Sequence, residues 1–275
     1  MNYELIRGGD QLRIKKVIFK NYYGEEMTFT RHFPLYIEKI NTFGVSGRFV
    51  SDNLIGSPGI YTSSFEDSGK TITAEFAFWN RYGDTQTLKK IERVFTPLKT
   101  GLLTVFDTDN MIYRIEAYPT AMPSYNQSGK VIKWTVNFQA DYPYWRKGYE
   151  MISKVCSVGH DTVIYNPCMT PVPVEIVFPV CSQRRSFSIV DQGTNFVIKP
   201  VESAVGDVVV STKDFSVRKV SDGSPVSNSI LSAETDIGDI MLMPGSNTIR
   251  MTRLLNDFVY PDSIVRFWEL TAGVI

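Results

Sequence analysis

A strictly alternating strand that runs into a cluster of aromatic residues around a proline constrains this chain more than any other feature. Residues 130–139 place apolar side chains on one face and polar ones on the other, and the apolar set is Ile132, Trp134, Val136 and Phe138. A period of two residues is typical of a strand with one buried face. Pro143 follows and ends the strand pairing, because proline has no N–H to donate.

This junction predicts two domains, residues 1–145 and residues 146–275. A chain of 275 residues is long enough for each half to bury its own core. We expect five residues to pack in the domain junction: Trp134, Tyr142, Pro143, Tyr144 and Trp145. Two other interpretations stay open, because exposed Tyr and Trp rings also stack on sugar faces or contribute to protein interfaces.

Composition excludes several classes of protein. The chain is 43% hydrophobic and 21% charged, which is typical of a soluble globular protein. No stretch approaches the roughly 18 apolar residues of a membrane span, and the first residues lack the basic-then-apolar order of a signal peptide. We therefore expect synthesis in a cytoplasm and no membrane insertion.

The charges divide unevenly along the chain. Residues 1–149 carry 19 Lys and Arg against 15 Asp and Glu, whereas residues 150–275 carry 10 against 14, so the halves have formal charges of +4 and −4. A split of this size favours contacts between neighbouring chains, but it is far from the basic stripe of a nucleic-acid-binding protein. The sequence predicts no sequence-specific binding of nucleic acid.

The first half reads as a β-domain with one helix. Four runs and a later hairpin have the pattern of strands, at residues 12–19, 27–30, 35–40, 71–79, 101–106 and 111–118. Residues 84–96 differ, because Asp84 is a suitable N-cap, apolar residues follow at helical spacing, and Pro97 ends the run. We expect this helix to cover a β-sheet.

The second half contains no persuasive helix. Its eight short runs predict strands at residues 172–178, 186–190, 195–199, 207–211, 215–220, 238–243, 247–252 and 263–270. Turn sequences separate them, and this pattern is typical of a two-sheet sandwich. The predicted fold class is therefore mostly β, with a barrel-like or sandwich-like first domain and a β-sandwich second domain.

Residues that carry chemistry are sparse. The sequence has no GxSxG, HExxH, Walker A or GxGxxG motif, and neither His32 nor His160 lies in a cluster with metal-ligand spacing. The loop from Asp107 to Asn110 has carboxylates but lacks the rest of a calcium-binding loop, so we interpret it as a tight turn. We expect no catalytic residues, no bound metal and no cofactor.

The three cysteines, Cys156, Cys168 and Cys181, lie about a dozen residues apart. This spacing lacks the CxxC pairs of a structural zinc site. An odd number of cysteines also argues against a disulfide framework, and we expect buried, reduced thiols.

Four features together resemble the distal tail protein family of long, non-contractile-tailed phages. They are the single helix followed by a hairpin, the strand at residues 131–139 leading into residues 141–145, the segment at residues 165–176, and the Pro-Gly element at residues 240–249. Each is weak alone, and their order and spacing along nearly the whole chain supply the specificity.

The resemblance implies a structural virion protein rather than an enzyme. In that family, first domains pair into a hexameric ring around a channel, and the second domain is a galectin-like sandwich. The resemblance implies a place in the phage tail tip, with the tail tube protein, the tape-measure protein end, a tail-associated hub or lysin, and receptor-binding proteins as partners. The alternative is a carbohydrate-binding β-sandwich module that recognises a host cell surface.

Overall fold

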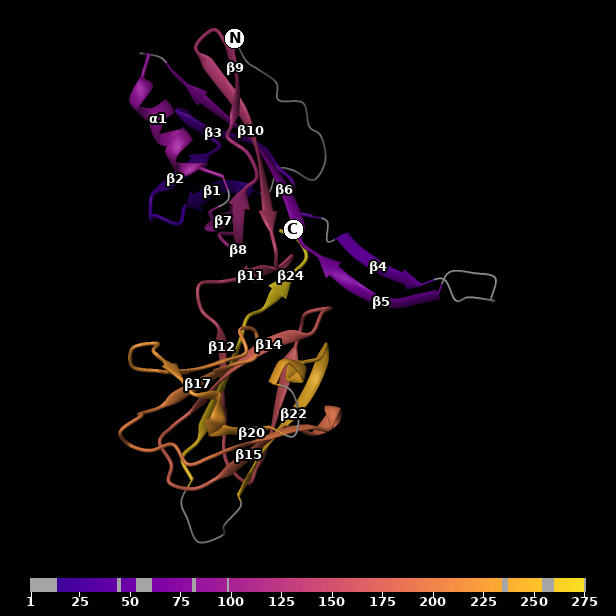
Figure 1. Cartoon of the computed structure of the whole chain (residues 1–275). Helices are drawn as coiled ribbons and strands as arrows, with labels where there is room; N and C mark the ends of the chain where they lie inside the picture. Colours follow the sequence, from indigo (N-terminus) through magenta and orange to yellow (C-terminus); the bar gives the residue numbers. More distant parts are fainter. Residues whose placement is uncertain are drawn as a thin grey trace. The chain divides into compact units, whose positions relative to one another are not determined.

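The computed structural model describes residues 14–43, 46–52, 61–80, 83–97, 99–233, 237–253 and 260–274. The chain forms two compact units, and Figure 1 shows the elements of each. The first unit consists of two segments, Met1–Gly148 and Thr271–Ile275, and the second unit consists of Tyr149–Leu270. The sequence pattern does not predict that residues 271–275 belong to the first unit.

A ten-stranded sheet forms the body of the first unit. Its strands are β1 (Ile14–Lys20), β2 (Glu26–Thr30), β3 (Leu35–Ile40), β6 (Lys70–Trp79), β7 (Gly101–Asp107), β8 (Ile112–Pro119), β9 (Ser124–Ser128), β10 (Val131–Ala140), β11 (Trp145–Lys147) and β24 (Leu270–Thr271). Their order is β24-β11-β8-β7-β1-β2-β3-β6-β10-β9. A further pairing of β10 with β8, at Phe138 opposite Pro119, closes seven of these strands into a barrel.

Aromatic rings fill the barrel. The strands alternate buried and exposed residues, so each directs one set of side chains inward. The ring of Phe29 lies 4.1 Å from that of Phe76 and 5.9 Å from that of Trp134, measured between centroids. The inward face predicted for residues 130–139 is confirmed, because Ile132, Trp134, Val136 and Phe138 are all buried.

The predicted helix is confirmed as α1 (Thr85–Val94). The Asp84 carboxylate caps its first turn, where it accepts hydrogen bonds from the backbone N–H groups of Gln86 at 2.9 Å and Thr87 at 3.1 Å. Ile91 and Phe95 are fully buried, and the Phe95 ring stacks on that of Phe19 at 5.4 Å. The helix therefore covers the barrel core, as its apolar spacing predicts.

Two strands of the first unit stand apart from this sheet. Strands β4 (Ser46–Asp52) and β5 (Tyr61–Ser68) pair with each other in an antiparallel two-stranded sheet. In the part of the chain that the structure describes, this pair has no ladder to the ten-stranded sheet. We call β4 and β5 the ribbon (Figure 1).

The second unit is a sandwich of two sheets. Its strands are β12 (Ile152–Cys156), β13 (Asp161–Asn166), β14 (Val172–Phe178), β15 (Arg185–Ile189), β16 (Thr194–Ile198), β17 (Val208–Ser211), β18 (Ser216–Lys219), β19 (Pro225–Val226), β20 (Leu231–Ala233), β21 (Met241–Leu242), β22 (Gly245–Arg253) and β23 (Ser263–Phe267). Three short 3₁₀ turns lie between them, η1 (Val190–Gln192), η2 (Asn228–Ile230) and η3 (Ile237–Asp239).

Strands β12-β23-β14-β17-β18-β19 form one sheet, with β21 paired to β14, and β13-β22-β15-β16-β20 form the other. The two sheets meet through aromatic side chains. Phe178 of the first sheet lies 6.5 Å from Phe187 and 5.9 Å from Phe196 of the second, measured between ring centroids. The predicted mostly-β fold class, with a barrel and a sandwich, is therefore confirmed.

The sequence pattern finds most strands but not all. It misses both strands of the ribbon and the short or polar strands β9, β11, β12, β13, β19 and β20, whose residues lack a strong apolar alternation. The predicted strand at residues 238–243 is wrong in extent, because η3 occupies residues 237–239 and β21 contains only Met241 and Leu242. The predicted run at residues 263–270 is wrong as a single strand, because β23 ends at Phe267 and β24 begins at Leu270. Among the described residues, no helix is long and apolar enough to cross a membrane.

Local predictions about turns and thiols are also confirmed. The Asp107 carboxylate closes the hairpin turn, since its Oδ1 accepts hydrogen bonds from the backbone N–H groups of Asp109 and Met111, both at 2.8 Å. Asn110 adopts a left-handed φ of 64°, which asparagine tolerates. No disulfide joins the three cysteines, which all lie in described segments and are all buried.

Candidate functional site

The ten-stranded sheet ends in an exposed strand. Strand β9 pairs with β10 on one side, from Ser124 opposite Thr135 to Ser128 opposite Val131. It is the last strand in the sheet order, and all five of its residues are exposed. An edge strand presents a row of backbone N–H and C=O groups, which is a template for pairing with another chain.

The ribbon offers a second template of the same kind. A two-stranded sheet alone in water is at best marginally stable, because it has too few neighbours to pair or pack with. Strands β4 and β5 have seven and eight residues, so they are long enough to form an extended ladder with a further strand. Both the ribbon and β9 belong to the first unit.

An exposed aromatic groove also lies on the first unit. Its volume is about 420 Å³, and it is lined by Phe33, Pro34, Leu35, Phe78, Trp79, Asn80, Asp84 and Thr87. Phe33 is 50% exposed, and its ring lies 5.7 Å from the ring of Trp79. Large exposed apolar side chains that gather in one place are typical of interaction surfaces.

The structure places the predicted junction residues in different surroundings. Trp134 and Trp145 are buried in the core of the first unit, and Pro143 is buried as well. Tyr142 and Tyr144 are half-buried, and their rings form an edge-to-face pair at 5.5 Å. The exposed Tyr and Trp platform that the sugar-stacking interpretation requires therefore lacks Trp145, which has no exposed surface.

The indole of Trp145 has specific polar neighbours. Its Nε1–H donates a hydrogen bond to the backbone carbonyl of Thr42 at 3.1 Å, and the Lys70 ammonium lies 5.9 Å from the ring centroid. Lys70 is fully buried, and burial lowers its pKa to about 8 because the charged form loses hydration. Its Nζ donates to the backbone carbonyl of Ala272.

Two sequence elements that carry the family resemblance meet inside the second unit. Asn166 is buried, and its Nδ2 donates to the carbonyls of Leu242 at 2.8 Å and Thr170 at 3.1 Å. Its Oδ1 accepts from the N–H of Cys168 at 2.9 Å. The element at residues 165–176 is therefore joined to the one at residues 240–249 by this amide side chain, in addition to the pairing of β14 with β21 and of β13 with β22.

The second of these elements has its own buried asparagine. Asn247 Oδ1 accepts from the N–H of Met243 at 2.8 Å, and its Nδ2 donates to the carbonyls of Met243 at 2.8 Å and Gly245 at 3.1 Å. Gly245 has a φ of 90°, a conformation that favours glycine. The side chain of Asn247 and the left-handed glycine therefore close the turn between β21 and β22.

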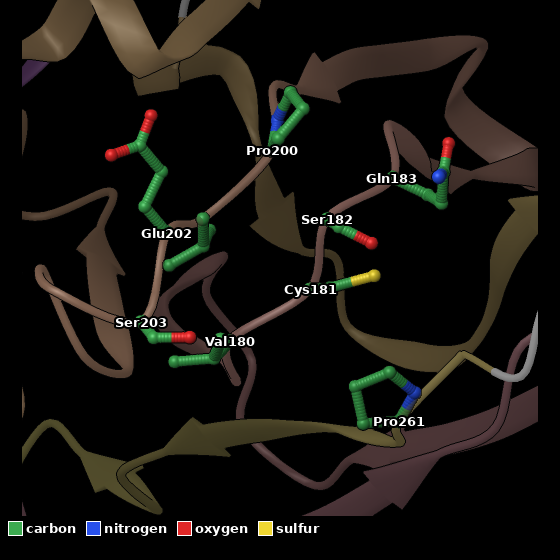
Figure 2. Close-up of a pocket in the computed structure, with 9 residues that line it drawn as sticks. Val180, Cys181, Ser182, Gln183, Pro200, Glu202, Ser203 and Pro261 are labelled. Carbon is green, nitrogen blue, oxygen red and sulfur yellow. The ribbon is translucent and has the colours of Figure 1, made fainter.

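A pocket lies on the second unit, and Figure 2 shows its lining. Its volume is about 660 Å³, and it is formed by residues 180–183, residues 200–203 and Pro261. The thiol of Cys181, the hydroxyls of Ser182 and Ser203 and the carboxylate of Glu202 contribute polar groups, and none of the lining residues is aromatic. The pocket thus offers hydrogen bonds but no ring on which a sugar face stacks.

A buried arginine, Arg185, follows two residues after the pocket-lining segment 180–183. Arg185 is fully buried, and its Nη2 donates to the carbonyl of Pro179 at 2.7 Å, while its guanidinium carbon lies 5.4 Å from the Phe178 ring centroid. Its Nε and Nη1 have no hydrogen-bond partner in the described structure. Burial lowers the pKa of Arg185, and the nearby Cys181 opposes this shift.

Acidic, histidine and cysteine side chains are scattered over the described segments. In these segments, no group of three or more His, Cys, Asp and Glu side chains lies together as metal ligands. The charged pairs are surface contacts, such as Arg93 with Glu25 at 2.8 Å and Arg250 with Asp161 at 2.6 Å.

Comparison with known proteins shows where this arrangement occurs. No protein-family model and no curated protein matches the sequence. The crystal structure of the Dit protein of phage SPP1, described as a paradigm of the hub adsorption apparatus in phages that infect Gram-positive bacteria, aligns with 93% of this chain and 99% of its own, at a TM-score of 0.66 and 12% identity.

Chains of the activated phage P2 baseplate align as well. The calcium form has a TM-score of 0.52 at 9% identity, and the strontium form has a TM-score of 0.51 at 8% identity. Each alignment covers 95% of this chain and 99% of the other chain.

The two-unit fold is thus the class of fold found in phage tail-hub and baseplate proteins. Within this class, the resemblance to the distal tail protein family is confirmed at the level of the fold, over nearly the whole chain.

Several features of the first unit have no signal in the sequence. The ribbon, the edge strand β9 and the contacts of Lys70 are decided by pairings between distant segments, and a single sequence does not reveal them.

Proposed function

We propose that this chain is a structural subunit of a phage tail tip or baseplate, a distal tail protein without enzymatic activity. The observation that carries the proposal is the fold match to the phage SPP1 Dit protein, which spans 93% of this chain and 99% of that one. A match over both units is more specific than a match to a barrel or a sandwich alone, because each of these folds serves many functions.

The first unit is proposed to form a hexameric ring. Two features of this unit support a ring, namely the exposed edge β9 and the ribbon, which has no ladder to the main sheet in the described segments. Exposed strand edges promote uncontrolled aggregation unless another strand covers them. A closed ring covers every edge by symmetry, because each subunit meets its neighbour through two different surfaces.

The ring is proposed to join the tail tube protein and the tape-measure protein end to a tail-associated hub or lysin, and to carry receptor-binding proteins. The protein is accordingly proposed to reside in the virion after synthesis in the host cytoplasm. The formal charges of +4 and −4 on the two halves of the sequence support stacking between unlike components, since opposite charges favour encounter.

The segment with Tyr142, Pro143, Tyr144 and Trp145 is proposed to be the joint through which the first unit continues into the second. Two observations support this role. The first unit ends shortly after it, at Gly148, and Trp145 is anchored within the first unit by its hydrogen bond to Thr42. Trp134, in contrast, supports the joint from the barrel core.

Assembly is the property to test first. Gel filtration with light scattering, followed by negative-stain microscopy, is expected to show a particle with sixfold symmetry whose mass is that of a hexamer. A chain that stays monomeric at concentrations in the tens of micromolar, with no rings in the images, would contradict the ring.

A pair of variants separates the proposed edge from the rest of the surface. Ser124→Lys with Gln127→Lys adds two charges to the exposed edge strand β9, and lysine on an edge disfavours strand addition. Ser153→Lys is the matched control on the exposed part of β12 in the second unit. We expect the first variant to remain folded but unassembled and the control to assemble.

The alternative function, a carbohydrate-binding sandwich, has one observation in its favour. The pocket of about 660 Å³ presents the hydroxyls of Ser182 and Ser203 and the carboxylate of Glu202, which are groups that bind sugar hydroxyls. Titration calorimetry of the full chain with cell-wall glycans tests it, with Glu202→Gln as the matched variant. Binding by the wild type that Glu202→Gln removes would support this alternative.

A further inference from the structure

Residues 271–274 contact the two short segments that connect the ribbon to the barrel, which we call the roots of the ribbon. Thr42 and Phe43 lie just before strand β4, and Gly69 and Lys70 lie just after strand β5. The ribbon therefore leaves the barrel and returns to it through these two short segments. Both segments contact Thr271–Val274, the described part of the C-terminal segment that belongs to the first unit.

The first root is fixed by a reciprocal pair of hydrogen bonds. Thr42 Oγ1 donates to the carbonyl of Val274, and Val274 N–H donates to Thr42 Oγ1, and both distances are 3.3 Å. Thr42 is 2% exposed and Val274 is 4% exposed, so water competes little for these groups. A polar pair at this depth fixes the backbone of both partners.

The ring of Phe43 adds a close contact to the same root. A Cβ atom placed on Gly273 would lie 2.4 Å from Cδ1 of Phe43 and 2.7 Å from its Cε1. Real Cβ atoms essentially never show contacts under 3.0 Å, so the ring lies against the backbone of Gly273, and a side chain at this position would force the ring, which is 51% exposed, to move. The C-terminal segment is thus fitted to this root by shape as well as by hydrogen bonds.

The second root is held by a buried cation. Lys70 is fully buried, its Nζ donates to the carbonyl of Ala272, and its ammonium faces the ring of Trp145. Burying an ammonium group costs free energy unless its protons find acceptors, so the Ala272 carbonyl compensates part of that cost. Trp145 touches both roots, because its Nε1–H donates to the carbonyl of Thr42.

We infer that Thr271–Val274 is a strap that fixes both roots of the ribbon and so sets the ribbon for its contact with a second copy of this chain. This inference rests on the proposed ring, which it deepens by naming the segment that prepares one of the contact surfaces. The strap follows directly on the second unit in the sequence, so the ribbon is anchored only in a chain that includes the end of that unit.

Removing the strap is the direct test. The full chain is compared with a chain that ends at Leu270, by hydrogen exchange of the backbone amides and by the mass of the assembled particle. We expect exchange at residues 41–43 and in strands β4 and β5 to become at least tenfold faster, with β7 and β8 unchanged. The assembled fraction is expected to fall at least tenfold at equal protein concentration.

Two single substitutions keep the test decisive where the shortened chain does not fold. Gly273→Ala introduces the Cβ that meets Phe43, and Thr42→Val removes the hydroxyl that both hydrogen bonds to Val274 require. Ala272→Ser is the matched control, because the side chain of Ala272 is exposed and its carbonyl stays in place. We expect the first two to speed exchange in the ribbon and the control to leave it unchanged.

The outcomes separate the strap from the ring. Faster ribbon exchange in a chain that forms no ring even as wild type would support the strap and overturn the proposed ring. A wild type that forms rings, with variants whose exchange and assembly both match it, would overturn the strap and leave the proposed ring standing. Ribbon amides that already exchange at the unprotected rate in the wild type would also overturn the strap.

Discussion

The two units stabilise β-structure in different ways. The first unit closes seven strands into a barrel around stacked aromatic rings, and it leaves a ribbon and an edge strand outside that closure. The second unit packs two sheets against each other, and buried amide side chains fix two of its turns. The difference is that the first unit combines a closed barrel with strands outside it, whereas the second unit consists of two open sheets that end at β12 and β19 and at β13 and β20.

The buried polar contacts of the two units also differ in the sequence separation of the residues that they join. In the second unit, Asn247 closes a turn with Met243 and Gly245, and Asn166 joins Thr170 to Leu242, which lies 76 positions further along the chain. In the first unit, Thr42 and Lys70 reach residues more than 200 positions away. Both units use contacts between distant residues, but those of Thr42 and Lys70 span a longer stretch of the chain than those of Asn166.

The largest expected effect tests the aromatic core of the first unit. Trp145→Ala removes a fully buried ring and its hydrogen bond to Thr42, so we expect a loss of about 3–5 kcal/mol in the free energy of unfolding. Chemical denaturation followed by near-ultraviolet circular dichroism measures it. Tyr149→Ala, at a side chain that is 61% exposed, is the control and is expected to change little. An unchanged midpoint for Trp145→Ala would contradict the packing described for the first unit.

The corresponding test of the second unit removes a buried clamp. Asn247→Ala leaves the N–H and carbonyl of Met243 without their side-chain partner, and buried groups left unpaired cost about 1–3 kcal/mol. We expect a loss of about 2 kcal/mol that affects exchange in β21 and β22 and spares the barrel. Ser153→Ala, at an exposed position, serves as the control. Equal loosening of both units would show that they do not unfold separately.

The pH dependence of stability tests the burial of Lys70 in the first unit. Burial lowers the pKa of Lys70 from its ordinary value of 10.5 to about 8, so the unfolded chain binds more protons than the folded chain between these values. Stability therefore rises with pH in this window, by about 1 kcal/mol from pH 8 to pH 9. Measured as the difference between wild type and Lys70→Met, the gain is expected only in the wild type, with Lys154→Met as the exposed control. A flat difference would mean that Lys70 is hydrated.

The smallest expected effect concerns a surface ion pair of the second unit. Arg250 Nε and Nη2 lie 2.6 Å from Asp161 Oδ1 and Oδ2, and this hydrogen bonding holds the pKa of Asp161 below its ordinary value of 3.8. The pair therefore adds stability above that value, and the contribution is lost as pH falls through the lowered pKa. Asp161→Asn is expected to lower the melting temperature slightly, and high salt should remove the difference. A large effect that persists in high salt would show that the pair is structural.

Local patterns in the sequence account for much of the fold. Strands β3 and β14 occupy the predicted residues, and the Asp84 cap begins the predicted helix. These elements are predictable because alternation, helical spacing and capping depend on neighbours a few residues apart. The sequence also identifies Asn247 as part of an element on which the family resemblance rests, although only the structure shows the hydrogen bonds that it makes.

The remaining features depend on segments far apart in the chain. Strand β9 is polar and exposed, so no hydrophobic period marks it, and its position follows from the turn that pairs it with β10. In the described structure the strands of the ribbon pair only with each other and not with the ten-stranded sheet. No local sequence pattern indicates which strands will pair. A sequence read alone therefore predicts elements well and edges poorly.

The sequence by itself determined a mostly-β chain with one helix and no known catalytic motif, and it predicts a domain junction at the aromatic-proline cluster. Only the tertiary structure decided that seven strands close into a barrel, that β9 is the last strand of the sheet while the ribbon pairs only with itself in the described residues, and that Thr271–Val274 contact Thr42 and Lys70. The reason is physical. Periodicity reports which face of an element is apolar, whereas closure, edges and long-range hydrogen bonds arise from contacts between segments whose separation in sequence carries no local signal.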